Sequence, residues 1–177
     1  MLSEYCSVSK TAVWRWVVKL REKLNIASEG KARRFIAVDE ACVKVNGEKY
    51  WVYSALDIDR NELISMRVYP TRNSLTTESF IKGVLKYCDG KPEFIVDDAP
   101  WLRDALKELG LTHHNQARGL RSLIESAFPS FKQHTKTFFN KITVNLKHNT
   151  HLRWKRAVEC WNLFCKTFTY YYNHLRR

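Results

Sequence analysis

The sequence FIAVDE at residues 35–40 has a counterpart in FIVDD at residues 94–98. In each, a short run of β-branched and aromatic residues predicts a buried strand and leads straight into an aspartate, Asp39 or Asp97. A carboxylate at the end of a buried strand is poorly placed for mere solubility, so we interpret both as functional. Glu40 and Asp98 follow directly and would face away from their neighbours, and the pattern alone does not choose within either pair.

Strand signals continue from the first of these runs. Residues 34–45 and 48–56 flank Asn46-Gly47, a strong hairpin signal, and the turn at residues 57–61 leads to a third strand at 63–69. We therefore expect three consecutive antiparallel strands.

Helices and strands alternate in the rest of the chain. In order, we expect a helix capped by Thr76 or Thr77, a strand at 93–96, a helix from Pro100 to Gly110, a strand at 111–115, and helices at about 119–139 and 151–175. This βββ-α-β-α-β-α order predicts an α/β, ribonuclease-H-like (retroviral-integrase-like) fold. Its five-stranded mixed sheet would be flanked by helices, with a long helix at the C-terminus.

In that order three carboxylates converge. Asp39 lies on the first, central strand, Asp97 ends the neighbouring fourth strand, and Glu125, within RSLIESAF, lies on the helix after the fifth strand. Magnesium is a hard cation that prefers oxygen ligands, and paired metals of this kind promote phosphodiester chemistry. Other aspartates, such as Asp57 and Asp104, are interpreted as turn or surface residues.

Composition indicates the class of partner. The chain has 30 Lys+Arg against 18 Asp+Glu, a formal net charge of +12, which favours a nucleic-acid partner. No apolar run approaches the roughly 20 residues needed to span a bilayer, so we expect a cytoplasmic, nucleoid-associated protein without a membrane partner. The five cysteines are expected to be reduced thiols, and a zinc site built from His148, His151, Cys160 and Cys165 is disfavoured.

The N-terminal residues predict a separate unit. Residues 1–25 combine hydroxyl side chains that can cap a helix with an apolar helical periodicity, and resemble part of a helix-turn-helix. Lys10 and Arg15 would then face DNA, although a basic helix packed on the domain fits the pattern equally well. Residues 26–32 are interpreted as a linker, and residues 33–177 as the catalytic domain.

The chain resembles the DDE transposases of bacterial and archaeal insertion sequences, in particular the IS-six group in its archaeal form. The resemblance is carried by VSKTAVWRWV (8–17) and by segments at 38–63, 94–111 and 121–141. It implies that Asp39, Asp97 and Glu125 are the metal ligands, in preference to Glu40 and Asp98. It also implies a basic residue seven positions after the glutamate, and Lys132 matches, about two helical turns away.

The implied activity is nicking at terminal inverted repeats, followed by attack of the freed 3′-hydroxyl on target DNA. Two Mg²⁺ (or Mn²⁺) ions would be the cofactors, double-stranded DNA the partner, and a homodimer or higher oligomer the synaptic form. The residues expected to contact DNA are Lys132, Lys136, Arg121, Lys10 and Arg15, with Arg33 and Arg34 among further candidates for its backbone.

Two departures from the family pattern leave alternatives. The helix-turn-helix lacks its first helix, which predicts N-terminal truncation, and Pro129 would kink the helix that carries Glu125. One alternative is a catalytically inactive DNA-binding remnant. Another is a ribonuclease-H-like nuclease acting on RNA–DNA hybrids.

Overall fold

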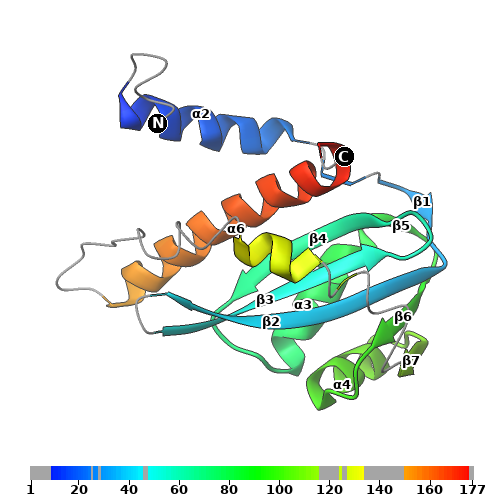
Figure 1. The fold of residues 1–177 in the computed structure, drawn as a ribbon. Helices are drawn as coiled ribbons and strands as arrows, with labels where there is room; N and C mark the ends of the chain where they lie inside the picture. Colours follow the sequence, from blue (N-terminus) through cyan, green and yellow to red (C-terminus); the bar gives the residue numbers. More distant parts are fainter. Residues whose placement is uncertain are drawn as a thin grey trace.

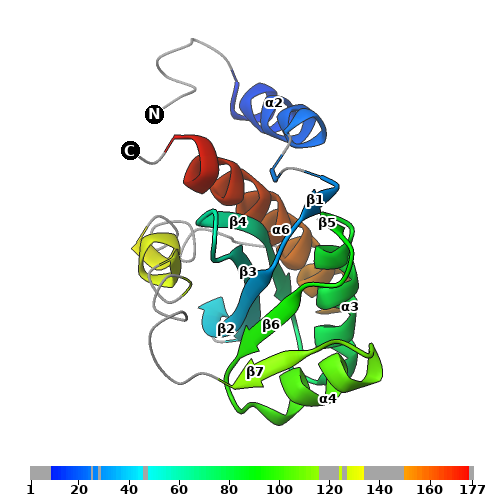
Figure 2. The same ribbon diagram turned by 90° about the vertical axis from the view of Figure 1, so that its right-hand side faces the viewer.

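The structure, a computed structural model, describes residues 9–24, 26–27, 29–45, 48–115, 124, 127–133 and 150–175. Its centre is a five-stranded mixed sheet with helices on both faces (Figures 1 and 2). The strand order is β4-β3-β2-β6-β7, with bounds β2 Phe35–Val45, β3 Glu48–Asp57, β4 Glu62–Tyr69, β6 Glu93–Val96 and β7 His113–Asn115. The first three strands are antiparallel, and β6 and β7 run parallel to β2, which confirms the predicted ribonuclease-H-like order.

The two hairpins follow from their turn residues. Val45 pairs with Glu48, so the loop between β2 and β3 has the two-residue length that Asn-Gly favours. Between β3 and β4, Asn61 takes a positive φ of 49°, a conformation that asparagine tolerates better than most residues. The same turn is stabilised by Arg60, whose backbone N–H donates to Asp57 Oδ1 at 3.1 Å.

Helix α3 (Ser74–Leu85) starts earlier than predicted. Its N-cap is Asn73, which accepts a hydrogen bond from the Thr76 backbone at 2.9 Å, while Thr76 Oγ1 accepts from the Asn73 backbone at 3.1 Å. The prediction of Thr76 or Thr77 as the cap was therefore wrong. Thr76 is the reciprocal member of a capping box, and Thr77 is buried.

Helix α4 (Pro100–Glu108) begins at the predicted proline and ends two residues before Gly110, where the glycine stop was predicted. Proline at the first helical position removes only an N–H that has no partner within the helix. At the other end Gly110 takes a φ of 60°, and the N–H groups of Gly110 and Leu111 donate to Lys107 and Leu106, both at 3.0 Å. This is the glycine-ended hydrogen-bond pattern that satisfies the last carbonyls of a helix.

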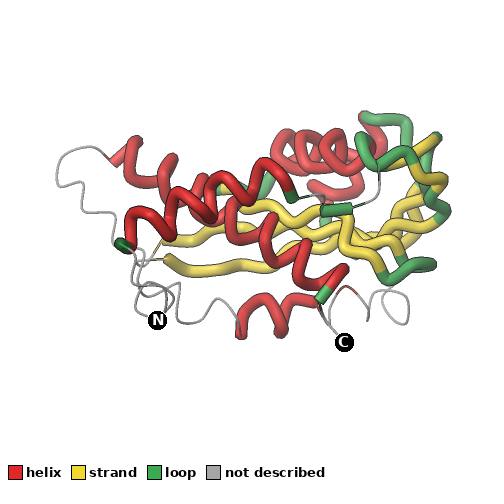
Figure 3. The backbone as a smooth tube through the Cα atoms, turned by 90° about the horizontal axis from the view of Figure 1, so that it is seen from above, coloured by secondary structure: helices red, strands yellow, loops and turns green. Residues whose placement is uncertain are grey.

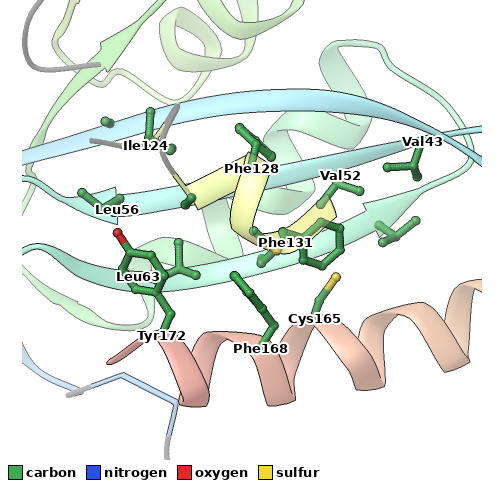
Figure 4. Close-up of a cluster of buried hydrophobic side chains, with 14 of the residues drawn as sticks. Val43, Val52, Leu56, Leu63, Ile124, Phe128, Phe131, Cys165, Phe168 and Tyr172 are labelled. Carbon is green, nitrogen blue, oxygen red and sulfur yellow. The ribbon is translucent and has the colours of Figure 1, made fainter. Parts of the chain in front are cut away.

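Helices cover both faces of the sheet (Figure 3), and an apolar cluster fills each of the two interfaces. Helix α6 (Thr150–His174) and the helical residues 127–133 cover one face, and α3 and α4 cover the other. In the first layer Phe131 packs edge-on against Phe168, and Cys165 is a buried member of the same cluster (Figure 4). Burial raises the pKa of the Cys165 thiol, which supports its interpretation as a small hydrophobic residue rather than a zinc ligand.

Helix α6 also covers the hydrogen-bonding edge of β4. Asn173 Oδ1 accepts from the Leu63 N–H and its Nδ2 donates to the Leu63 carbonyl, both at 2.8 Å. Asn162 makes the equivalent pair with Val68, at 2.9 and 3.4 Å. Eleven helical residues rise about 16.5 Å and five strand residues about 17 Å, so the two asparagines match this spacing. An edge strand is thereby protected from pairing with another chain.

The N-terminal segment packs against the domain. Helix α2 (Lys10–Lys23) is capped by Ser9, whose Oγ accepts from the Ala12 N–H at 3.1 Å, and it lies beside α6 on the side away from the sheet (Figure 1). Strand β1 (Lys31–Ala32), at the end of the predicted linker, pairs in parallel with β5 (Cys88–Asp89).

Among the described residues no helix has the length and apolar character to cross a membrane.

Candidate active site

The parallel pairing of β2 and β6 brings the two aspartates to one level. Ala37 pairs with Ile95 in this register. Carrying it two residues further places Asp39 level with Asp97, the first residue after β6. This proximity was predicted from sequence, because the fourth strand of this topology lies beside the first.

Asp39 belongs to the sheet face under α6, and Asp97 follows Ile95 of the same face by two residues. Ala37 and Ile95 are in the apolar cluster on that face, and side chains two residues apart on a strand share a face. Ile124 and Ala127, which flank Glu125 in the sequence, are buried in the same cluster. Glu125 itself lies outside the described residues.

Backbone N–H groups orient both carboxylates. Asp39, 9% exposed, accepts a hydrogen bond through Oδ1 from the Glu40 N–H at 2.9 Å. Asp97 Oδ1 accepts from the N–H of Ala99, the N-cap of α4, at 3.1 Å. The neighbouring Asp98 instead turns to solvent, with its side chain 73% exposed and paired with Arg103 at 3.2 Å.

Glu40 lies on the opposite face of β2, as strand alternation predicts. Its side chain is 4% exposed, Oε1 accepts from Trp101 Nε1 at 3.1 Å, and Arg72 approaches the same oxygen to 3.5 Å. The pKa of Glu40 is raised to about 7, first by burial and then by the negative charges of Asp97 and Asp39. This end of the β2–β6 pair is therefore a region of negative potential.

Two buried oxygens at this level have no hydrogen-bond partner among the described residues. One is Glu40 Oε2, and the other is the hydroxyl of Ser54, the residue of β3 that pairs with Asp39. The Asp39 and Asp97 carboxylates, with the Ser54 hydroxyl beside Asp39, suit a hydrated divalent cation such as Mg²⁺, which keeps several water molecules, whereas Glu40 Oε2 lies on the other face of β2. Asp39 and Asp97 thus fit the metal by chemistry, although no group of three potential ligands occurs within the described ranges.

The expected DNA-contacting residues are dispersed. Lys132 is exposed on the helical residues 127–133, and Arg15 is exposed on α2. Lys10 begins α2, but its side chain is outside what the structure describes, as are Lys136 and Arg121. These five stay predictions.

The interpretation of Arg33 as a DNA-backbone contact is wrong. Its side chain is 0% exposed, and Nη1 lies 2.6 Å from Asp57 and 2.9 Å from Glu62. Long basic side chains look alike in a sequence whether they reach solvent or a buried carboxylate.

Sequence reasoning missed the residues around Glu40. The Arg72 guanidinium stacks between two indole rings, 3.7 Å from the Trp51 centroid and 3.9 Å from that of Trp101. Stacking of this kind stabilises by about 0.5–2 kcal/mol for each ring. The only sequence signal was the abundance of tryptophan, which does not identify a partner.

The fold is that of a retroviral integrase catalytic core, a ribonuclease-H-like class. The catalytic core of HTLV-2 integrase, in its dimeric form with magnesium, is similar at a TM-score of 0.57 and 13% identity, over 82% of this chain and 90% of that one. The simian T-cell lymphotropic virus intasome, in complex with PP2A regulatory subunit B56 gamma, contains a chain similar at a TM-score of 0.58 and 14% identity. That match covers 85% of this chain and 52% of the other.

Sequence comparison defines the family within that class. A family model of the DDE domain of IS240-type transposases matches residues 34–155. An uncharacterized protein of Methanocaldococcus jannaschii is 35% identical over 168 residues, which is 95% of this chain and 78% of that protein. The chain belongs to the DDE transposase family, as its motifs predicted.

Proposed function

We propose that this chain is a transposase that nicks DNA at the terminal inverted repeats of an insertion sequence and joins the freed 3′-hydroxyl to target DNA. Asp39, Asp97 and Glu125 are its catalytic carboxylates. The observation that carries the proposal is the parallel register of β2 and β6, which brings Asp39 of β2 level with Asp97, directly after β6, in a chain of the DDE family.

The chain's own residues supply a pre-oriented set of oxygen ligands. The hydrogen bonds from the Glu40 and Ala99 backbones hold one oxygen of Asp39 and one of Asp97. Asp39, Asp97 and Glu125 would hold two Mg²⁺ (or Mn²⁺) ions. When bound, these ions would activate the attacking oxygen and stabilise the leaving oxygen of the phosphodiester.

Double-stranded DNA is the proposed partner, both as element ends and as target. The net charge of +12 favours a polyanion, and exposed Lys132 and Arg15 are candidates for phosphate contacts. Lys132 stands seven positions after Glu125 in the sequence, as the family pattern implies, so we propose that it binds DNA close to the carboxylates. Joining two element ends requires at least a homodimer.

A nicking assay tests the proposal. The substrate is a duplex that carries the inverted repeats flanking the gene, end-labelled and incubated with Mg²⁺ or Mn²⁺. We expect strand-specific nicks from the wild type and none above background from Asp39→Asn, Asp97→Asn or Glu125→Gln. Asp98→Asn is the matched control, because the exposed Asp98 adjoins Asp97 yet turns to solvent, and it should nick as the wild type does.

Each alternative function gives a different outcome. Wild-type nicking that persists in Asp39→Asn would overturn the assigned site. Salt-sensitive DNA binding without metal-dependent nicking would identify a DNA-binding remnant. Cleavage of an RNA–DNA hybrid but not of repeat DNA would select the nuclease.

A further inference from the structure

Four side chains from four separate segments meet behind the aspartate pair. Trp51 of β3 and Trp101 of α4 hold between them the guanidinium of Arg72, which lies in the loop between β4 and α3. Glu40 of β2 uses a single oxygen, Oε1, for both partners: it accepts a hydrogen bond from Trp101 and forms an ion pair with Arg72. We name these four residues the arginine clip.

Two members of the arginine clip are close to the aspartates along the chain. Glu40 is its member on β2, and the Glu40 N–H is the group that orients Asp39. Trp101 is its member on α4, two residues after Ala99, whose N–H orients Asp97. The backbone donor to Asp39 therefore belongs to a residue that Arg72 contacts, and the donor to Asp97 lies two residues before another.

Such an arrangement exceeds what stability of the fold requires. Glu40 occupies a position on an apolar face, beyond Ile36 and Val38, where an aliphatic side chain would pack without a charge partner. A buried carboxylate beside two other carboxylates is costly unless something holds it. The arginine clip holds it, and Arg72 keeps its own side chain 32% exposed while doing so.

We propose that Arg72, clamped between Trp51 and Trp101 and bound to Glu40, is a positioning residue that sets the relative placement of Asp39 and Asp97. It acts through the Glu40 and Ala99 backbones and does not touch the reacting atoms. The proposal rests on the proposed function only in taking the two aspartates as metal ligands.

The first test uses metal-free, ¹⁵N-labelled protein. The indole N–H signals of Trp51 and Trp101 are assigned with Trp51→Phe and Trp101→Phe, and the Glu40 and Ala99 amides by standard triple-resonance experiments. Arg72→Ala should shift both indole signals and both amides. Arg72→Lys, which keeps the charge but loses the planar group, and Glu40→Gln, which keeps the acceptor for Trp101, should give smaller shifts of the same signals.

The second test measures Mn²⁺ affinity by calorimetry and the Mg²⁺ dependence of nicking. Arg72→Ala should weaken Mn²⁺ binding by up to about 10-fold, the lower end of the effect of removing a direct hydrogen-bond partner of a metal ligand, because Arg72 acts on the aspartates through Glu40 and Trp101. The apparent KM for Mg²⁺ should rise by a similar factor, with kcat at saturating Mg²⁺ much less affected. The matched control is Arg103→Ala, which removes an arginine from α4 that pairs with Asp98 without ring stacking, and it should change neither measurement.

The outcomes separate the two proposals. If Arg72→Ala folds and leaves the Glu40 and Ala99 amides in place, or binds Mn²⁺ as tightly as the wild type does, the positioning role is overturned. If Arg72→Ala does not fold, Arg72→Lys and Glu40→Gln decide by the same criteria. If the wild type binds no metal, the proposed function fails, while the amide shifts still decide whether the arginine clip positions the two segments.

Discussion

Two clusters of buried charged residues lie along strand β2, one at its start and one where its pairing with β6 ends. They differ in how positive and negative side chains are combined. At the start, the fully buried Arg33 lies between two carboxylates, 2.6 Å from Asp57 and 2.9 Å from Glu62, and Arg33 Nε donates to the Tyr87 carbonyl at 3.2 Å. Opposite charges meet directly there, and the cluster ties Arg33, two residues before β2, to the end of β3 and the start of β4.

The second cluster consists mainly of carboxylates that lie close to one another. Asp39 and Glu40 are adjacent, Asp97 is level with Asp39, and the pKa of Glu40 is raised to about 7 by burial and by the two aspartates. A carboxyl group whose pKa is raised by burial and by neighbouring carboxylates is typical of a functional site, even where an arginine such as Arg72 also contacts it. We infer that the first cluster maintains the fold and that the second is kept for chemistry, and four predictions test this difference.

Arg33→Ala should have the largest effect on stability. Removing one partner of a buried ion pair leaves the others uncompensated, so we expect the free energy of unfolding to fall by about 3–5 kcal/mol. Urea denaturation measures this. Mn²⁺ affinity of the folded variant should match the wild type, and a loss of affinity without a loss of stability would reverse the two roles.

Metal binding should stabilise the second cluster. At a Mg²⁺ or Mn²⁺ concentration of about 100 times Kd, the free energy of unfolding should rise by about 2.7 kcal/mol, because the folded state binds the ion. In Asp39→Asn that rise should vanish, while stability in a chelator is unchanged or higher because one repelling charge is gone. Denaturation with and without metal checks both, and an equal rise in Asp39→Asn would contradict the assignment.

Asn173→Ala supplies an uncharged standard for comparison with both clusters. The substitution leaves the Leu63 N–H and carbonyl, and the Ile26 carbonyl, without their side-chain partner. We expect a loss of about 1–3 kcal/mol in unfolding free energy and a greater tendency to associate through the edge of β4. Glu159→Ala, an exposed change on the same helix, is the control, and light scattering detects the association.

Arg60→Ala should have the smallest effect. Arg60 approaches the same Asp57 oxygen as Arg33 does, at 3.1 Å, but its side chain is 43% exposed. Exposed ion pairs contribute about 0–1 kcal/mol, so thermal unfolding should barely change. A loss as large as that of Arg33→Ala would mean that the shared partner, and not burial, sets the strength of the first cluster.

Much of the fold was predictable because its signals are local. The hairpins follow from turn residues, the end of α4 from Gly110, and the faces of β2 from its alternation. The start of α3 was misjudged because Asn73 and Thr76 are both good capping residues, and only the backbone conformation shows which one is the cap. Helix α2 was also expected, while its reading of DNA stays a prediction.

The site was predictable in part. Two apolar runs that end in aspartate, in a topology that pairs their strands, indicated Asp39 and Asp97 together. The roles of Arg33 and Arg72 were not predictable, because both are basic residues in polar loops. One proved to be fully buried against carboxylates and the other stacked between two indole rings.

The sequence by itself determined the order of elements, the opposite facing of Asp39 and Glu40, and the family, because these depend on periodicity and on motifs a few residues long. Only the tertiary structure decided which distant groups meet. Glu40 and Trp101 are 61 positions apart, and Leu63 and Asn173 are 110 apart. A contact of that kind depends on how the sheet twists and on which helix covers which strand, and no local pattern carries that information.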